Sequence, residues 1–164
     1  MCKMAHFGNC DPETADREYC IFHKPNKSEE EAVEFYKKFL ERFKPRVEEI
    51  EVEGQKIKRL VFEGPVDASG YVFPEIPDVP IEYVDSQGNL WGLKFSLWKS
   101  LFKKEANFSG AIFIYADFVE AIFEEGASFV GAHFKYVFFL RCQTFYLMQI
   151  FLEQSLRKIW ISIG

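Results

Sequence analysis

The most regular alternation of apolar and polar positions lies in the second half of the chain, at residues 106–139. Alanine and phenylalanine stand two positions apart there, and the pair returns about every five residues. Residues two apart on an extended chain point to the same side. Each unit of five therefore predicts a short extended piece with two inward side chains, followed by a polar turn. The inward set is Ala106, Ala111, Ala116, Ala121, Ala127 and Ala132, with Phe108, Phe113, Phe118, Phe123, Phe129, Phe134 and Phe139.

A unit of five residues cannot bury its apolar face alone, but a stack of such units buries a continuous core. Adjacent layers of extended chain lie about 4.8 Å apart, so we expect each phenylalanine to stack on another. Gly126 adds one residue between the fourth and fifth units. We expect it to break the register by one and to form a bulge at a corner, where glycine tolerates unusual dihedrals.

The units Ala106-Asn107-Phe108 and Ala116-Asp117-Phe118 carry a wider resemblance. They resemble the consensus of the pentapeptide-repeat family, which is Ala, then Asp or Asn, then Leu or Phe, then two variable residues. The resemblance implies a mainly β fold, a right-handed quadrilateral β-helix with four units of five in each coil. We assign residues 46–141 to this solenoid, with irregular coils up to 104 and pentapeptide repeats at 105–141.

A helix is predicted between the first segment and the β-helix. Ser28 with Glu31 three residues later forms a capping box, and Pro45 ends the pattern because the residue before proline avoids helical geometry. The apolar positions have helical spacing; they are Ala32, Phe35, Tyr36, Phe39, Leu40 and Phe43. We expect a helix at 29–43, within a segment 28–45 that caps one open end of the solenoid.

Residues 142–164 are expected to cap the other end. Apolar residues between Thr144 and Trp160 approximate one face of a helix. Further imperfect coils or edge strands are the alternative. Apolar residues that such a cap leaves exposed favour a homodimer through this C-terminal region.

Residues 1–27 have no periodicity and hold a cluster of candidate metal ligands: Cys2, Cys10, Cys20 and His23. The two-residue gap between Cys20 and His23 lets both side chains face one metal ion. Three thiols and one imidazole, without a carboxylate, suit a closed tetrahedral zinc site with a structural role. A disulfide, which the cytoplasm disfavours, and free thiols are the alternatives.

The resemblance adds to the zinc hypothesis. Small Cys/His modules that end in Tyr-Cys-x-x-His precede the repeats in some microbial members of the family, and Tyr19-Cys20-Ile21-Phe22-His23 is similar to that ending. His6 is expected to be a bystander or an outer-shell group. Cys142 is expected to be a buried free thiol, and His133 a surface residue.

Charge and motifs restrict the function. The net charge of −5 argues against a general nucleic-acid binder, which needs a basic face. We find no phosphate-binding loop, no Gly-x-Ser-x-Gly and no carboxylate–histidine set, so we do not expect an enzyme. We expect a non-enzymatic interaction or scaffold protein with an unidentified protein partner.

An acidic mimic of DNA is the alternative function. Five acids against one lysine give the segment 105–136 a net charge of −4. The family resemblance implies this function, because some pentapeptide-repeat proteins resemble DNA in shape and charge and bind type II topoisomerases. Localisation is expected to be cytoplasmic, because a secretory signal and an apolar run of about 18 residues are both missing.

Overall fold

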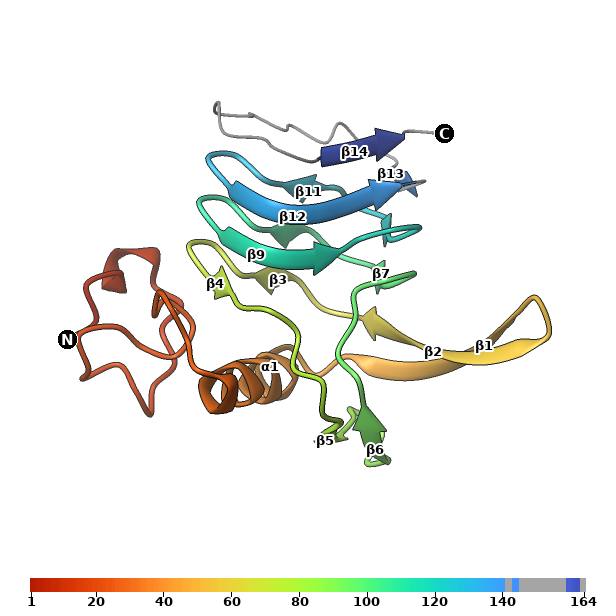
Figure 1. The fold of residues 1–164 in the computed structure, drawn as a ribbon, viewed down its shortest axis with the longest axis horizontal. Coiled ribbons are helices and arrows are strands. Elements are labelled where there is room, and N and C mark those ends of the chain that lie inside the picture. Colours follow the sequence, from red (N-terminus) through yellow and green to blue (C-terminus); the bar gives the residue numbers. More distant parts are fainter. Residues whose placement is uncertain (141–142, 145–158, 163–164) are drawn as a thin grey trace.

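The computed structural model describes residues 1–140, 143–144 and 159–162. These residues contain one α-helix, α1 (Glu29–Phe43), a short 3₁₀-helix, η1 (Ala5–Phe7), and strands arranged in stacked layers (Figure 1). The strands are β1 (Arg46–Val52), β2 (Gln55–Phe62), β3 (Val66–Asp67), β4 (Val72–Phe73), β5 (Ile81–Val84), β6 (Leu90–Leu93), β7 (Leu101–Phe102), β8 (Ala106–Asn107), β9 (Ile112–Asp117), β10 (Ile122–Phe123), β11 (Ala127–Ser128), β12 (His133–Leu140), β13 (Gln143–Thr144) and β14 (Ile159–Ser162).

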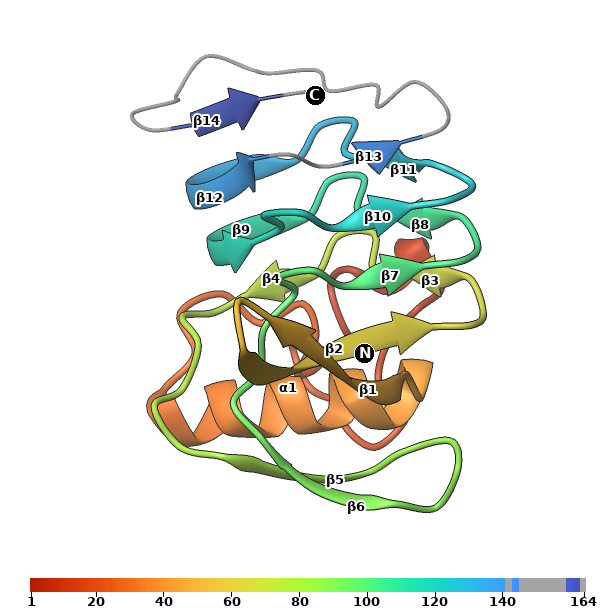
Figure 2. The same cartoon turned by 90° about the vertical axis from the view of Figure 1, so that its right-hand side faces the viewer.

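Three parallel sheets run through the stack. Their strand orders are β2-β7-β10-β13, β3-β8-β11 and β4-β9-β12-β14, and each pairing joins one layer to the next (Figures 1 and 2). Ala106 pairs with Ala127 and Leu101 with Ile122, so one layer follows the next after four units of five and one extra residue. The period of five thus builds stacked parallel strands, as the pattern predicts.

Phenylalanine rings form the core of this stack, which confirms the expected stacking. The rings of Phe62 and Phe102 lie 4.6 Å apart and nearly parallel, and Phe123 continues the column at 4.8 Å. Two further columns are Phe73, Phe113 and Phe134, at 4.6 and 5.3 Å, and Phe108 with Phe129, at 5.1 Å. Burying each ring contributes about 1.5–3 kcal/mol before the entropy of ordering is counted.

Gly126 lies at a corner with a φ of +90°, but the expected break in register is wrong. The number of residues between paired positions at this corner is the same in two successive layers, from Phe123 to Ala127 and from Phe102 to Ala106. The first layer has the same step, from Phe62, the partner of Phe102, to Val66, the partner of Ala106. The extra residue therefore recurs in each of these three layers and keeps them aligned.

The segment 46–104 contains two antiparallel hairpins, which the expectation of looser coils did not include. β1 pairs with β2, and β5 pairs with β6. Only the end of β2, together with β3, β4 and β7, joins the parallel stack. The stretch from Val66 to its partner Ala106 is almost twice as long as the stretch from Ala106 to its partner Ala127. The β5–β6 hairpin accounts for this excursion from the first layer.

Helix α1 has the predicted bounds and the predicted capping box. Ser28 Oγ accepts a hydrogen bond from Glu31 N at 3.2 Å, and Ser28 N donates to Glu31 Oε2 at 2.9 Å. The buried face packs on the first layer, where the Phe39 ring meets those of Phe73 and Phe62 at 5.6 and 6.1 Å. The helix therefore covers the N-terminal end of the stack (Figure 2).

The predicted C-terminal helix falls mostly on residues outside the described ranges, as does Cys142. Where residues are described, the prediction of a helix is wrong. Thr144 lies in β13, parallel to β10, and Ile159 and Trp160 lie in β14, parallel to β12. Strands are extended in these positions because each finds a partner in the layer below. Within the described part of the chain, no helix is long and apolar enough to cross a membrane.

Candidate metal centre

The segment before α1 is held by hydrogen bonds across its loops. Cys2 N donates to Ala15 O at 2.8 Å, which places the start of the chain against the following loop. A tight turn presents the last two candidate ligands, because His23 N and Lys24 N both donate to Cys20 O. Cys20 N in turn donates to Cys2 Sγ at 3.3 Å. Cys2, Cys20 and His23 are thereby brought together.

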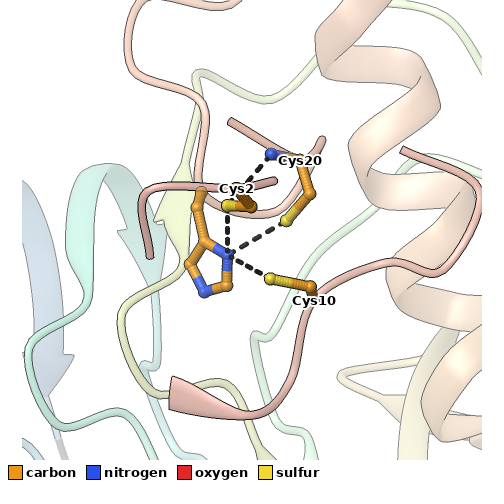
Figure 3. A group of neighbouring side chains, drawn as sticks. Cys2, Cys10 and Cys20 are labelled. Carbon is orange, nitrogen blue, oxygen red and sulfur yellow. Dashed lines mark hydrogen bonds between the residues drawn. The ribbon is translucent and has the colours of Figure 1, made fainter. Parts of the chain in front are cut away.

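The four predicted ligands converge on one point (Figure 3). Their ligand atoms all lie within 4.8 Å of one another. His23 Nδ1 is 3.8 Å from Cys2 Sγ, 3.7 Å from Cys10 Sγ and 3.0 Å from Cys20 Sγ. Sulfurs bound tetrahedrally at about 2.3 Å from one zinc ion stand about 3.8 Å apart. The cluster could hold a metal ion after only small adjustments of the side chains.

The cluster is enclosed. Cys2, Cys20 and His23 are at most 3% exposed, and Cys10 is partly buried. The group contains no carboxylate. A site with four protein ligands and so little exposure has no open position for a reacting water, which is the property of a structural metal site.

Burial and mutual contact perturb the cysteine thiols. Burial raises the pKa of Cys10 to about 12, and hydrogen bonds with Cys2 and Cys20 act in the same direction. For Cys2, burial is the largest cause and acts upward, but the backbone N–H groups of Cys20 and Met4 leave its pKa below the ordinary value. The thiols therefore differ in acidity although they lie in one cluster.

The imidazole is held in its neutral form. Burial lowers the pKa of His23 to about 4. The backbone of Ser69 acts in the opposite direction and raises the pKa, but burial is the larger cause. Neutral imidazole with Nδ1 directed at three sulfurs is the form that binds a metal ion.

Residues of the first layer contact His23 and form hydrogen bonds with the loops that carry the cluster. The Tyr71 ring meets His23 edge-on at 5.5 Å, and its hydroxyl donates to Asn9 O at 3.2 Å. Asn9 Nδ2 donates to Ser69 O at 2.9 Å. Val72 N donates to Phe22 O at 2.8 Å. The N-terminal segment is thus attached to the stack by the residues that flank its ligands.

The remaining sequence candidates lie elsewhere. His6 is not in the ligand group and contacts Phe7 instead, with ring centroids 4.4 Å apart. His133 begins β12 and is exposed, as expected. Sequence reasoning missed the supporting roles of Asn9 and Tyr71, and of Phe7, whose ring stacks on that of His23 with centroids 5.8 Å apart. None of the three has a spacing that distinguishes it from other loop residues, so no signal in the sequence identifies them.

Comparison with known proteins agrees with the repeat interpretation. Residues 97–143 match the family model described as pentapeptide repeats, in nine copies. Searches of curated proteins and of solved structures gave no match. The matched segment starts at Leu97, upstream of the regular units that begin at residue 105 in the sequence pattern, and includes β7, which stacks between β2 and β10. Over residues 97–143, the chain is therefore similar to the pentapeptide-repeat family.

Proposed function

We propose that this protein is a non-enzymatic interaction module, in which a structural zinc ion ties the N-terminal segment to a pentapeptide-repeat stack. The observation that carries the proposal is the buried set of Cys2, Cys10, Cys20 and His23, whose ligand atoms lie within 4.8 Å of one another. Thiolate and imidazole ligands in a closed tetrahedron favour zinc over harder cations.

Metal analysis of the purified protein tests the zinc site. We expect about one zinc ion per chain, because four ligands serve one ion, and a lower melting temperature after chelation. Cys20→Ser should lose the metal, whereas Cys142→Ser, which changes none of the four ligands, should keep it. A metal-free protein with an unchanged melting temperature in chelator, or a disulfide detected by mass, would contradict the zinc site.

We propose further that the stack is a right-handed quadrilateral β-helix. Three observations support it: the parallel pairings between layers, the regular step from one layer to the next and the stacked phenylalanine columns. Four units of five with one corner residue make such a step. A crystal structure of the chain checks this, and a layer with three sides or a left-handed winding would refute it.

The outer faces of the stack are proposed as the interaction surface. Outward side chains there are constrained only by their neighbours in adjacent layers, so their chemistry can vary without disturbing the core. Chemical cross-linking of the metal-loaded protein in lysate, followed by mass spectrometry, tests this. Reproducible cross-links from residues on the outer faces support the proposal, and cross-links confined to the N-terminal segment count against it.

The alternative as an acidic mimic of DNA has weaker support. The acids of the repeat segment are partly neutralised by ion pairs between layers. Lys99 pairs with Glu120, and Lys104 Nζ lies 2.9 Å from Glu125 Oε1. A phosphate-like surface needs unpaired negative charge. We expect no inhibition in a type II topoisomerase supercoiling assay. Inhibition in that assay would support the function as a mimic of DNA.

A further inference from the structure

A cavity of about 480 Å³ opens on the side of the stack where the first layer is interrupted. One wall comes from Glu75 and Ile76, just after β4, and a second from residues 94–96, just after β6. The third wall is the face of β9 and β12 above them, which contributes Tyr115 and Tyr136. The cavity volume is in the range of small-molecule sites.

The pairing of the strands explains why the cavity exists. β9 pairs with β12 along most of its length, up to Asp117 and its partner Phe138. On the other side, β4 pairs with β9 only through Val72 and Phe73. The chain then leaves the first layer for the β5–β6 hairpin, and Figure 1 shows both legs of this excursion below β9. Among the described residues, the end of β9 has no strand beneath it.

The lining mixes aromatic and apolar side chains with polar ones. Tyr115 and Tyr136 are direct partners in neighbouring parallel strands, which places their backbones about 4.8 Å apart. Phe95 is 4% exposed and lines the cavity together with Ile76. Tyr136 is 45% exposed, which is high for a large aromatic residue of a stacked sheet. Two neighbouring tyrosine side chains thus line the cavity.

The charge of the cavity is negative. Asp117 and Glu75 line it against one lysine, Lys94, whose Nζ lies 3.1 Å from Asp78 Oδ1 outside the lining. Lys135, next to Tyr136 in the chain, has its Nζ 5.6 Å from the centre of that ring. Both lysines therefore have partners other than Asp117.

Asp117 is better placed than Glu75 to attract a positive charge into the cavity. Its Oδ1 accepts a hydrogen bond from Val119 N at 2.9 Å, which fixes the carboxyl in the half-buried wall. Burial raises the pKa of this carboxyl, with the Val119 hydrogen bond acting in the opposite direction. No ion pair to Asp117 is formed within the described residues. A cation in the cavity would supply the missing counter-charge.

We propose that this cavity binds a small organic cation, with its ammonium or guanidinium group on Asp117 and its alkyl or aromatic body between Tyr115, Tyr136 and Phe95. A cation over a tyrosine ring is attracted by the negative charge of the ring face, and the attraction grows as the cation loses its water. A carboxylate ligand would meet Asp117 and Glu75 with the same charge. The inference rests on the repeat stack and the hairpin, and is independent of the zinc site.

Titrations of the full chain with four matched compounds, followed by NMR, test the charge preference. The compounds are n-butylammonium, n-butylguanidinium, n-butanol and butyrate, at constant ionic strength. We expect saturable shifts of the Val119 and Ser96 amides with both cations. The alcohol should bind about tenfold more weakly, which corresponds to about 1.4 kcal/mol, and butyrate should not bind. Equal affinity for the cations and the alcohol, or no saturable shift with the cations, would overturn the proposal.

Asp117→Asn isolates the charge, because an asparagine keeps the local turn. Asn107 Oδ1 accepts from Ser109 N at 3.0 Å in the same geometry one sheet away. We expect the variant to lose about tenfold in affinity for both cations while its affinity for n-butanol is unchanged. Asp67→Asn is the control, because Asp67 Oδ1 accepts from Ser69 N at 3.1 Å outside the cavity. Undiminished cation binding by Asp117→Asn would sink the proposal.

Discussion

The Phe7 ring occupies the space that a side chain at Gly70 would need. A Cβ built on Gly70 would lie 2.4 Å from Phe7 Cε2, and one on Gly110, in the next layer, 3.4 Å from Phe7 Cζ. Both glycines have left-handed backbones, with φ of +70° and +66°. The Phe7 ring also stacks on His23 at 5.8 Å. One ring therefore contacts a candidate metal ligand, His23, and the corners of two layers.

Gly70→Ala should destabilise the protein more than Gly131→Ala does. Both positions have a positive φ, which costs alanine about 1–2 kcal/mol. A Cβ at Gly131 meets nothing closer than 3.9 Å, whereas at Gly70 it collides with the Phe7 ring. We expect an additional 1–3 kcal/mol, roughly, from this overpacking. Urea denaturation of the two variants measures the difference.

Removing the ring should remove that difference. In a Phe7→Ala background, Gly70→Ala should cost about as much as Gly131→Ala, roughly 1–2 kcal/mol, because only the strain of the backbone is left. If the losses in free energy of unfolding from Phe7→Ala and Gly70→Ala simply add in the double mutant, the ring moves aside freely. The contact between Phe7 and Gly70 would then not hold the N-terminal segment in place.

Phe108→Ala should be among the most damaging core substitutions. Its ring is fully buried and contacts those of Phe73, Phe102, Phe113, Phe118 and Phe129. Truncation of a buried phenylalanine costs about 3–5 kcal/mol. Val130→Ala, at a site that is 41% exposed, should change stability by less than about 0.5 kcal/mol. Equal decreases in the melting temperatures of the two variants would contradict the layered core.

Stability should rise between pH 7 and pH 9 because of Lys27. Burial lowers its pKa from 10.5 to about 7, and its Nζ donates to Lys24 O and Val72 O, both at 2.7 Å. In this pH range the folded state releases the proton while the unfolded state keeps it. The unfolded state therefore binds more protons, and stability increases by up to about 1.4 kcal/mol per pH unit.

Lys27→Met should flatten this pH dependence. Methionine keeps the apolar stem over the Phe35 ring, where Lys27 Nζ lies 4.8 Å from the ring centre. Urea denaturation at half-unit pH steps, with the metal kept saturating in both proteins, gives the two slopes. The absolute stability of the variant does not decide the question, because two carbonyls lose their donor. A slope equal to that of the parent protein would show that Lys27 titrates normally.

Local chemistry made α1 and the repeat units predictable. The reciprocal bonds of Ser28 and Glu31 involve residues three apart, and the Ala-x-Phe spacing determines which side chains share a face. The cluster of Cys2, Cys10, Cys20 and His23 was predictable from residue type, because three thiols and an imidazole lie in one short segment without periodicity.

The hairpins and the cavity depend on contacts between distant residues. No local pattern indicates that the chain leaves one layer after β4 and returns far later than the regular step would bring it back. The cavity combines residue 75 with residues 94 and 117, which only the stacking brings together. The step at Gly126 was misread because its equivalent between Phe102 and Ala106 precedes the regular units.

The excursion between β4 and β7 is also a place where the chain can accept an insertion. Its two ends are fixed in the core by Phe73 and Leu97, and its far turn lies at Gly88, whose backbone has a φ of +83° and whose Cβ would meet nothing within 4 Å. Closing a loop of twice the length costs only about 0.6 kcal/mol more. A whole foreign domain inserted at this turn should leave every layer above it in place.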